Sequence, residues 1–288
     1  MSIGSWTPLV SVEDLAAALG EPALRLLDAR AVLGDPSAGR AAHAASHLPG
    51  AVHADLDRDL SDHAARGQGR HPLPDAAAFA HRVGEWGIGP AHQVVVYDAG
   101  DGSMAAARAW WLLKLLGHQR VAVLDGGLAA WRTAGLPETA EAASPVPLPA
   151  WPSSGFDRSR IADAADVAAR LGQAPGWLLD ARGAERYRGE VEPIDPVAGH
   201  VPGALNRPFA LNLREGRFRP AEELRGELQP LLHGRVPQDT VLMCGSGVTA
   251  CHLLLAMEHA GLPGAKVYAG SWSGWISDPS RPVATGAA

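Results

Sequence analysis

The pentapeptide "LLDAR" occurs twice in this chain, at residues 26–30 and again at residues 178–182, an offset of 152. Two further matches follow in the same order, at offsets of 153 and 144: "HLPGA" at 47–51 with "HVPGA" at 200–204, and "VLDGGLAAW" at 123–131 with "VYAGSWSGW" at 267–275. Three ordered matches at nearly constant spacing indicate that the chain contains two copies of one fold.

Within each half, short apolar runs alternate with helical patterns. The first half has the runs "ALRLLDA", "VVVYD" and "RVAVLD", with "AAARAWWLLKLLG" as a helical stretch, and the second half has "GWLLDA", "TVLMC" and "AKVYAG", with "ACHLLLAMEHAG". This alternation is typical of a parallel sheet with crossover helices. We therefore expect an α/β fold of two similar domains, each a mostly parallel five-strand sheet flanked by helices.

The chain length of 288 residues also favours two domains of ordinary size. We place the N-terminal domain at residues 1–137 and the C-terminal domain at residues 159–288. Residues 138–158 are rich in Pro, Ala and Ser without an apolar period, and we interpret them as an extended linker.

The amino-acid composition argues against some classes of binding partner for this protein. A net charge of -6 argues against nucleic-acid binding, which draws on Lys and Arg contacts to phosphates. No apolar stretch is long enough to span a membrane, and residues 1–10 lack the basic and apolar regions of a signal peptide. We therefore expect no membrane partner and a cytoplasmic location, where the two cysteines remain thiols.

The repeat serves as an internal control, because features that both halves share are expected to build the fold. Asp28 and Arg30 match Asp180 and Arg182, so we interpret both as structural ion pairs, with assistance to a bound anion as the alternative role of Arg182. His43 and His47 have the spacing of a metal pair on a helix, but only His47 is repeated, as His200. We expect no metal site.

The two halves differ after the apolar runs that end at Asp98 and at Cys244. Cys244 comes at the carboxyl end of its strand, where open α/β sheets bind ligands. Gly245 and Gly247 allow a tight loop whose backbone N–H groups point at the sulfur, and the helix expected from about Val248 adds its positive end. These features favour a reactive thiolate. The other cysteine, Cys251, falls inside an apolar helix and is interpreted as an inert core residue.

Other cysteine chemistries fit the loop less well. A cysteine phosphatase of the Cys-x5-Arg type requires Arg at position 250, where this chain has Ala250. A Cys-His hydrolase needs a nearby base, and we interpret His252, within the helix, as a packing or solvent-exposed residue.

The loop "CGSGVTA" at 244–250, with the repeat, resembles the tandem-domain rhodanese-like sulfurtransferases, and nearly the whole chain fits. The loop is most similar to the version in enzymes that use 3-mercaptopyruvate. The resemblance implies that Cys244 takes a sulfane sulfur from a donor, becomes a persulfide, and passes the sulfur to a thiol, cyanide or another acceptor. It requires no metal and no organic cofactor, and a thioredoxin-like reductant is an acceptor partner it suggests.

The resemblance also implies roles for individual residues. Arg186, with Arg188 as a helper, would bind the donor's carboxylate or sulfonate, and position 34, which matches 186 in the other half, is glycine. Ser246 with His71 and Asp57 would form a hydroxyl, imidazole and carboxylate set that handles protons. The remaining loop residues expected to contact substrate are Gly245, Gly247, Val248 and Thr249.

One departure from the pattern concerns the donor. Mercaptopyruvate enzymes usually carry a second substrate Arg in a Glu-Pro-Arg context, whereas this chain reads Glu192-Pro-Ile-Asp195. The favoured activity is sulfur transfer from 3-mercaptopyruvate. Thiosulfate as the donor, by the same mechanism, and a non-catalytic persulfide carrier remain as alternatives.

Overall fold

The computed structural model of the protein describes residues 4–100 and 105–287. The chain forms two compact units. The first contains the described residues up to Asp62, with Leu73–Asp157 and Glu215–Arg217. The second contains His63–Pro72, Arg158–Arg214 and the described residues from Phe218 onward. The main division falls between Asp157 and Arg158, and two short segments, His63–Pro72 and Glu215–Arg217, belong to a different unit from their neighbours in sequence. The domain bounds given above stay a prediction.

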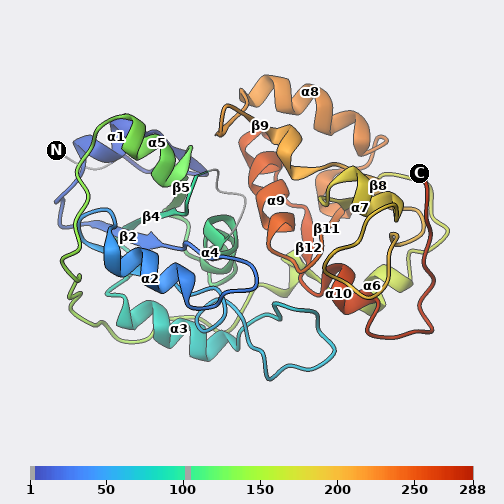
Figure 1. Ribbon diagram of the computed structural model, residues 1–288, viewed down its shortest axis with the longest axis horizontal. Coiled ribbons are helices and arrows are strands. Elements are labelled where there is room, and N and C mark those ends of the chain that lie inside the picture. The colour runs from blue at the N-terminus through green and yellow to red at the C-terminus, as the bar shows by residue number, and fades with distance from the viewer. Residues whose placement is uncertain (1–3, 101–104, 288) are drawn as a thin grey trace. The chain divides into compact units, whose positions relative to one another are not determined.

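Among the described residues, each unit contains one five-strand sheet whose paired strands are all parallel, as the sequence predicts (Figure 1). The first sheet has the order β1 (Leu9–Val10), β5 (Val121–Leu124), β4 (Gln93–Tyr97), β2 (Leu24–Asp28), β3 (Ala51–His53). The second has β6 (Ile161–Ala162), β12 (Lys266–Tyr268), β11 (Val241–Met243), β7 (Leu178–Asp180), β8 (Leu205–Asn206). The identical order confirms that the repeated sequence encodes a repeated fold.

Helices cover both faces of the first sheet. On one face, Leu15 of α1 (Val12–Ala17) and Trp131 of α5 (Gly127–Thr133) share a buried cluster with Val95 of β4. In Figure 1, α3 (Ala76–Glu85) lies on the opposite side of the strands from α1 and α5. Helix α4 (Ala105–Leu115), buried except at Lys114, packs on β4 and β5, and α2 (Ala38–Ala45) follows β2.

The second sheet is covered in the same way. Val167 of α6 (Ala164–Ala168), Tyr187 of α7 (Ala184–Arg188) and Trp272 of α10 (Ser271–Trp275) share a cluster with Met243 of β11. Helix α9 (Thr249–His259) packs against β11, β12 and α8 (Ala221–Leu231). The remaining short elements are η1 (Arg158–Arg160), η2 (Phe209–Asn212), β9 (Leu213–Arg214), β10 (Arg217–Phe218) and η3 (Pro237–Asp239). Because β11 lies in the middle of its sheet, its carboxyl end is surrounded by structure.

The shared polar motifs have structural roles, as predicted. Arg182 bonds Asp180 at 2.7 Å, and Arg30 bonds Asp28 at 2.5 Å. Burial alone would raise the pKa of Asp28, but hydrogen bonds from His43 and Arg30 outweigh it and hold the pKa at about 2. These pairs close the carboxyl ends of β2 and β7, the same place in each unit.

The stretch from 138 to 157 lies along the first unit. The Leu148 N–H donates to the Gly84 carbonyl at 2.9 Å, and the Trp151 indole donates to the Leu116 carbonyl at 3.0 Å. Trp151 is only 8% exposed, so it fastens this stretch to the unit's surface. Every helix in the described part of the chain is too short or too polar to span a membrane.

Candidate active site

Cys244 directly follows β11 and lies at the carboxyl end of this central strand. Its side chain is buried, and α9 begins five residues later, at Thr249, with Val248 as its N-cap. The strand, loop and helix therefore have the arrangement expected from the sequence. Parallel sheets bind ligands at this edge.

The sulfur of Cys244 accepts a hydrogen bond from the Gly247 backbone N–H at 3.1 Å. Gly247 has φ +80, and a Cβ there would lie 2.3 Å from the Ala269 carbonyl oxygen, so the loop requires glycine at this position. The bond provides one of the backbone donors predicted to stabilise an anionic sulfur.

The first turn of α10 fixes the other side of the loop. The N–H groups of Trp272 and Ser273 donate to the carbonyls of Cys244 and Gly245 at 2.9 and 3.0 Å. The Ser271 hydroxyl accepts the Cys244 N–H at 3.1 Å, and its oxygen lies 4.0 Å from the sulfur. These polar contacts together determine where the thiol lies.

The structure brings together two residues of the predicted proton-handling set. His71 Nδ1 lies 2.9 Å from the Ser246 hydroxyl, and both residues are buried. Asp57 belongs to the first unit, where its N–H donates to an Asp55 carboxylate oxygen at 3.0 Å. Its contribution to this set stays a prediction.

Arg186 lies beside the loop but is already bonded to two carboxylates. Its Nη2 contacts Glu192 Oε1 at 2.6 Å and Asp195 Oδ2 at 3.2 Å. Asp195 also pairs with Arg70, a residue that the sequence interpretation missed. The sequence signal that could have identified Arg70 is its position directly before His71. A loop has no regular periodicity, however, so the sequence does not reveal which way an arginine side chain in it points.

The guanidinium group of Arg182 stacks over Trp272, with 4.7 Å between Arg182 Cζ and the centroid of the indole ring. Burial would lower the pKa of Arg182, but Asp180, Glu192 and the nearby Cys244 outweigh burial and raise it. Its Nη1 is buried and makes no hydrogen bond within residues 4–100 and 105–287, and it lies 3.5 Å from a Glu192 carboxylate oxygen. A positive charge therefore stays close to the thiol at all physiological pH values.

Comparison with known proteins identifies the fold. The family model "Rhodanese-like domain" matches residues 11–134 and 163–278. The chain belongs to the rhodanese-like domain family. It contains two such domains, the first mostly in the first unit and the second mostly in the second.

Individual relatives of this rhodanese-like protein are similar over nearly their whole length. The chain is 52% identical to "Probable 3-mercaptopyruvate sulfurtransferase" of Pseudomonas aeruginosa, covering 96% of this chain and 98% of the relative. It is 42% identical to SseB of Mycobacterium tuberculosis, a protein named provisionally as a thiosulfate sulfurtransferase. The match covers 97% of this chain and 98% of that relative. A crystal structure from Escherichia coli, titled as a 3-mercaptopyruvate enzyme, matches with a TM-score of 0.76 at 33% identity, covering 93% of this chain and all of that one.

Three further residues predicted to contact substrate lie at or near the ends of helices in the second rhodanese-like domain. Arg188 forms an ion pair with Glu190 at 2.7 Å. It follows Arg186 by two residues, which is more than half a turn of α7, so the two arginine side chains leave the helix on different sides. The structure therefore gives no support to a helper role for Arg188. Val248 is buried at the N-cap of α9, and Thr249 is the first residue of that helix.

The two side chains interpreted as packing residues are buried in α9. The Cys251 thiol donates to the Gly247 carbonyl at 3.1 Å. The His252 ring stacks on Phe218 with 4.7 Å between centroids, so the packing interpretation is confirmed and solvent exposure is not. No group of three His, Cys, Asp or Glu side chains able to hold a metal occurs within residues 4–100 and 105–287.

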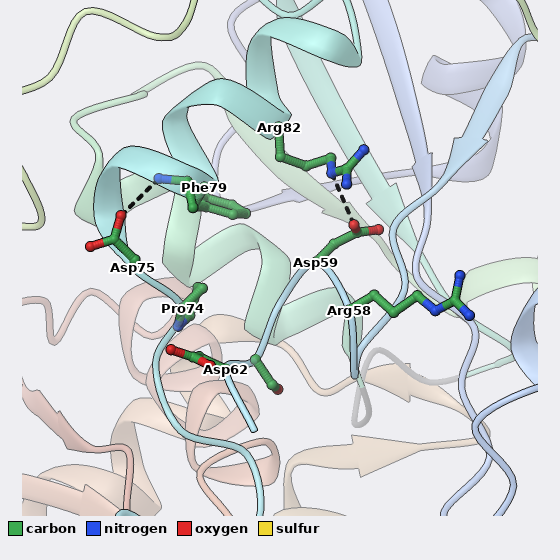
Figure 2. Close-up of a pocket in the computed structure, with 9 residues that line it drawn as sticks. Arg58, Asp59, Asp62, Pro74, Asp75, Phe79 and Arg82 are labelled. Atoms are coloured by element: carbon green, nitrogen blue, oxygen red, sulfur yellow. Dashed lines mark hydrogen bonds and ion pairs between the residues drawn. The ribbon is translucent and has the colours of Figure 1, made fainter. Parts of the chain in front are cut away.

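The first rhodanese-like domain contains a hollow of about 310 Å³, which Figure 2 shows. Three of its charged groups have structural partners: Arg82 Nε lies 3.0 Å from Asp59 Oδ1, and the Asp75 carboxylate accepts from the first N–H groups of α3. Burial raises the pKa of Asp59, although Arg82 opposes the shift. These contacts stabilise α3 and the loop before it.

Proposed function

We propose that the protein is a sulfurtransferase that moves a sulfane sulfur from 3-mercaptopyruvate to a thiol, cyanide or another acceptor through a persulfide on Cys244. The observation that carries the proposal is the Cys244 loop itself. The sulfur ends a central strand, accepts a backbone N–H, and lies near the Arg182 guanidinium. Groups that stabilise a thiolate stabilise the terminal sulfur of a persulfide anion in the same way.

In the first step, the Cys244 thiolate attacks the sulfur of the donor, and a sulfur–sulfur bond forms as the donor's carbon–sulfur bond breaks. The bonding electrons leave with the carbon as the enolate of pyruvate, and the donor's thiol proton balances the charge when that enolate is protonated. The hydrogen-bonded Ser246 and His71 are positioned to carry this proton.

In the second step, an acceptor thiolate or cyanide attacks the outer sulfur of the persulfide. The sulfur–sulfur bond breaks, the acceptor becomes a persulfide or thiocyanate, and the Cys244 thiolate is restored. Both cysteines are free thiols, which suits a reducing compartment such as the cytoplasm and a thioredoxin-like protein as one acceptor. No nucleic acid is needed at any step.

The first test is intact mass after incubation with 3-mercaptopyruvate. One added sulfur atom per chain is expected, absent in Cys244→Ala and retained in Cys251→Ala, because Cys251 is buried and bonded within its helix. Mapping of the added mass to Cys251 would contradict the assignment.

The second test distinguishes the alternatives by turnover. With cyanide in excess, we expect a higher kcat/KM with 3-mercaptopyruvate than with thiosulfate on the same preparation. The opposite order would favour a thiosulfate enzyme. A chain that loads once and does not turn over with small acceptors would be a persulfide carrier.

A further inference from the structure

Arg70 lies in the segment 63–72, which belongs to the second unit. The Arg70 N–H donates to the Ser273 hydroxyl at 3.0 Å, and Gly69, with φ +90, packs so closely that a Cβ on it would lie 2.4 Å from the Gly270 carbonyl oxygen. The backbone of Arg70 is therefore fixed against α10, the same helix that holds the Cys244 loop.

The side chain of Arg70 extends over the residue after the cysteine. A Cβ placed on Gly245 would lie 2.9 Å from Arg70 Nη2 and 3.5 Å from Arg186 Nη1. Two guanidinium groups from distant parts of the chain thus meet above one glycine. Because Gly245 has no side chain, the two guanidinium groups can approach the backbone of the loop this closely.

These guanidinium groups have hydrogen-bond donors left over. Asp195 accepts from Arg70 Nη1 and from Arg186 Nη2, and so bridges the two side chains. Glu192 accepts from Arg186 Nε and Nη2. Among the residues that the structure describes, Arg70 Nε has no hydrogen-bond partner although it is buried, while Arg70 Nη2 and Arg186 Nη1 face Gly245. A buried donor without an acceptor costs free energy, and guanidinium N–H groups bond oxygen anions strongly, so an oxygen anion is favoured here.

The local charge balance favours a monoanion. Arg70, Arg182 and Arg186 face three carboxylates, those of Asp180, Glu192 and Asp195, which leaves no excess positive charge. A carboxylate adds one negative charge beside the thiolate, whereas thiosulfate adds two. Since like charges repel most strongly where burial excludes water, the carboxylate is the better fit.

We propose that Arg70 is a donor-binding residue that, together with Arg186, binds the carboxylate of a 2-oxo acid sulfur donor above Gly245, with Asp195 positioning the two side chains. This proposal rests on the proposed sulfurtransferase function and specifies which residue selects the donor.

The test compares Arg70→Ala and Arg70→Lys with Arg66→Ala, a matched control that removes an exposed Arg from the same segment. Arg70→Ala should raise KM for 3-mercaptopyruvate by about tenfold to a hundredfold, the range for a lost charge-assisted hydrogen bond, with kcat changed by less than about threefold. Arg70→Lys should lie between, and Arg66→Ala should match the wild type.

A second donor separates anion binding from a general disturbance of the site. 1-Mercaptopropan-2-one has a methyl group in place of the carboxylate, so its kcat/KM should be equal in the wild type and Arg70→Ala. An unchanged KM for 3-mercaptopyruvate, or an equal loss with both donors, overturns the proposal.

Binding of pyruvate, measured by titration calorimetry, keeps this test independent of turnover. Pyruvate carries the same 2-oxo carboxylate without a sulfur, and Arg70→Ala should weaken its binding about as much as it raises KM. If the wild type transferred no sulfur, the proposed function would fail. A pyruvate affinity equal in the wild type and Arg70→Ala would still refute the role of Arg70.

Discussion

Ser271 has φ +51 at the position where the repeat places Gly127, which has φ +55. Left-handed backbone costs a non-glycine residue roughly 1–2 kcal/mol, so the second unit carries strain that the first avoids. The Ser271 hydroxyl explains this exception, because it accepts the Cys244 N–H at 3.1 Å and lies 4.0 Å from the sulfur. The strained serine positions the thiol.

Two substitutions separate the hydroxyl of Ser271 from its strain. Ser271→Gly and Ser271→Ala both remove the hydroxyl and should each lower kcat/KM by about tenfold, the cost of roughly one hydrogen bond. Ser271→Ala keeps the strain, so chemical denaturation should find it less stable than Ser271→Gly by about 1 kcal/mol. Full activity in Ser271→Gly would show that the serine has no role at the site.

At the scale of elements, the strands and long helices were predictable because their apolar residues are continuous. The β4 run "QVVVY" and the α9 run "TACHLLLAMEH" are almost entirely buried, as their composition indicates. The segment 63–72 was not predictable in this way. It is polar and glycine-rich, and only its contacts with Ser273 and Gly270 reveal which unit it joins.

The loop between β11 and α9 depends on glycine at 247. Gly247→Ala places a Cβ 2.3 Å from a backbone oxygen at φ +80, so we expect a loss of about 2 kcal/mol or more in unfolding free energy and a fall in kcat/KM of at least a hundredfold. The Gly247 N–H can then no longer reach the sulfur. Gly226→Ala is the matched control, because this exposed glycine lies inside α8 and an added Cβ would meet no described atom within 4 Å apart from the helix backbone; it should stabilise the protein by up to about 1 kcal/mol. Equal effects of the two substitutions would refute this account of the loop.

At the scale of the whole molecule, the two units share a backbone scaffold and differ in the groups placed on it. Leu128 and Ala129 donate to the carbonyls of Asp98 and Ala99 at 2.9 and 3.0 Å. Trp272 and Ser273 make the matching bonds to Cys244 and Gly245. Comparison of the halves could therefore identify Cys244, since only one half has a thiol on the shared scaffold. The comparison could not identify Arg70, because this residue lies outside the repeated motifs. Residues 101–104, in the loop after Asp98, lie outside the described residues.

The shared scaffold allows a test of what a thiol alone can do. Asp98→Cys in a Cys244→Ala background puts a cysteine on the first unit's scaffold, fixed by the same two backbone bonds. The first unit has Gly34 where the second has Arg186, and Gly100 where the second has Ser246. Without a guanidinium at the position of Arg186 and a hydroxyl at the position of Ser246, this thiol should take up no sulfur from 3-mercaptopyruvate, as judged by intact mass. Uptake at position 98 comparable to that at Cys244 in the wild type would mean that the scaffold suffices, and that the groups around Cys244 tune the reaction without enabling it.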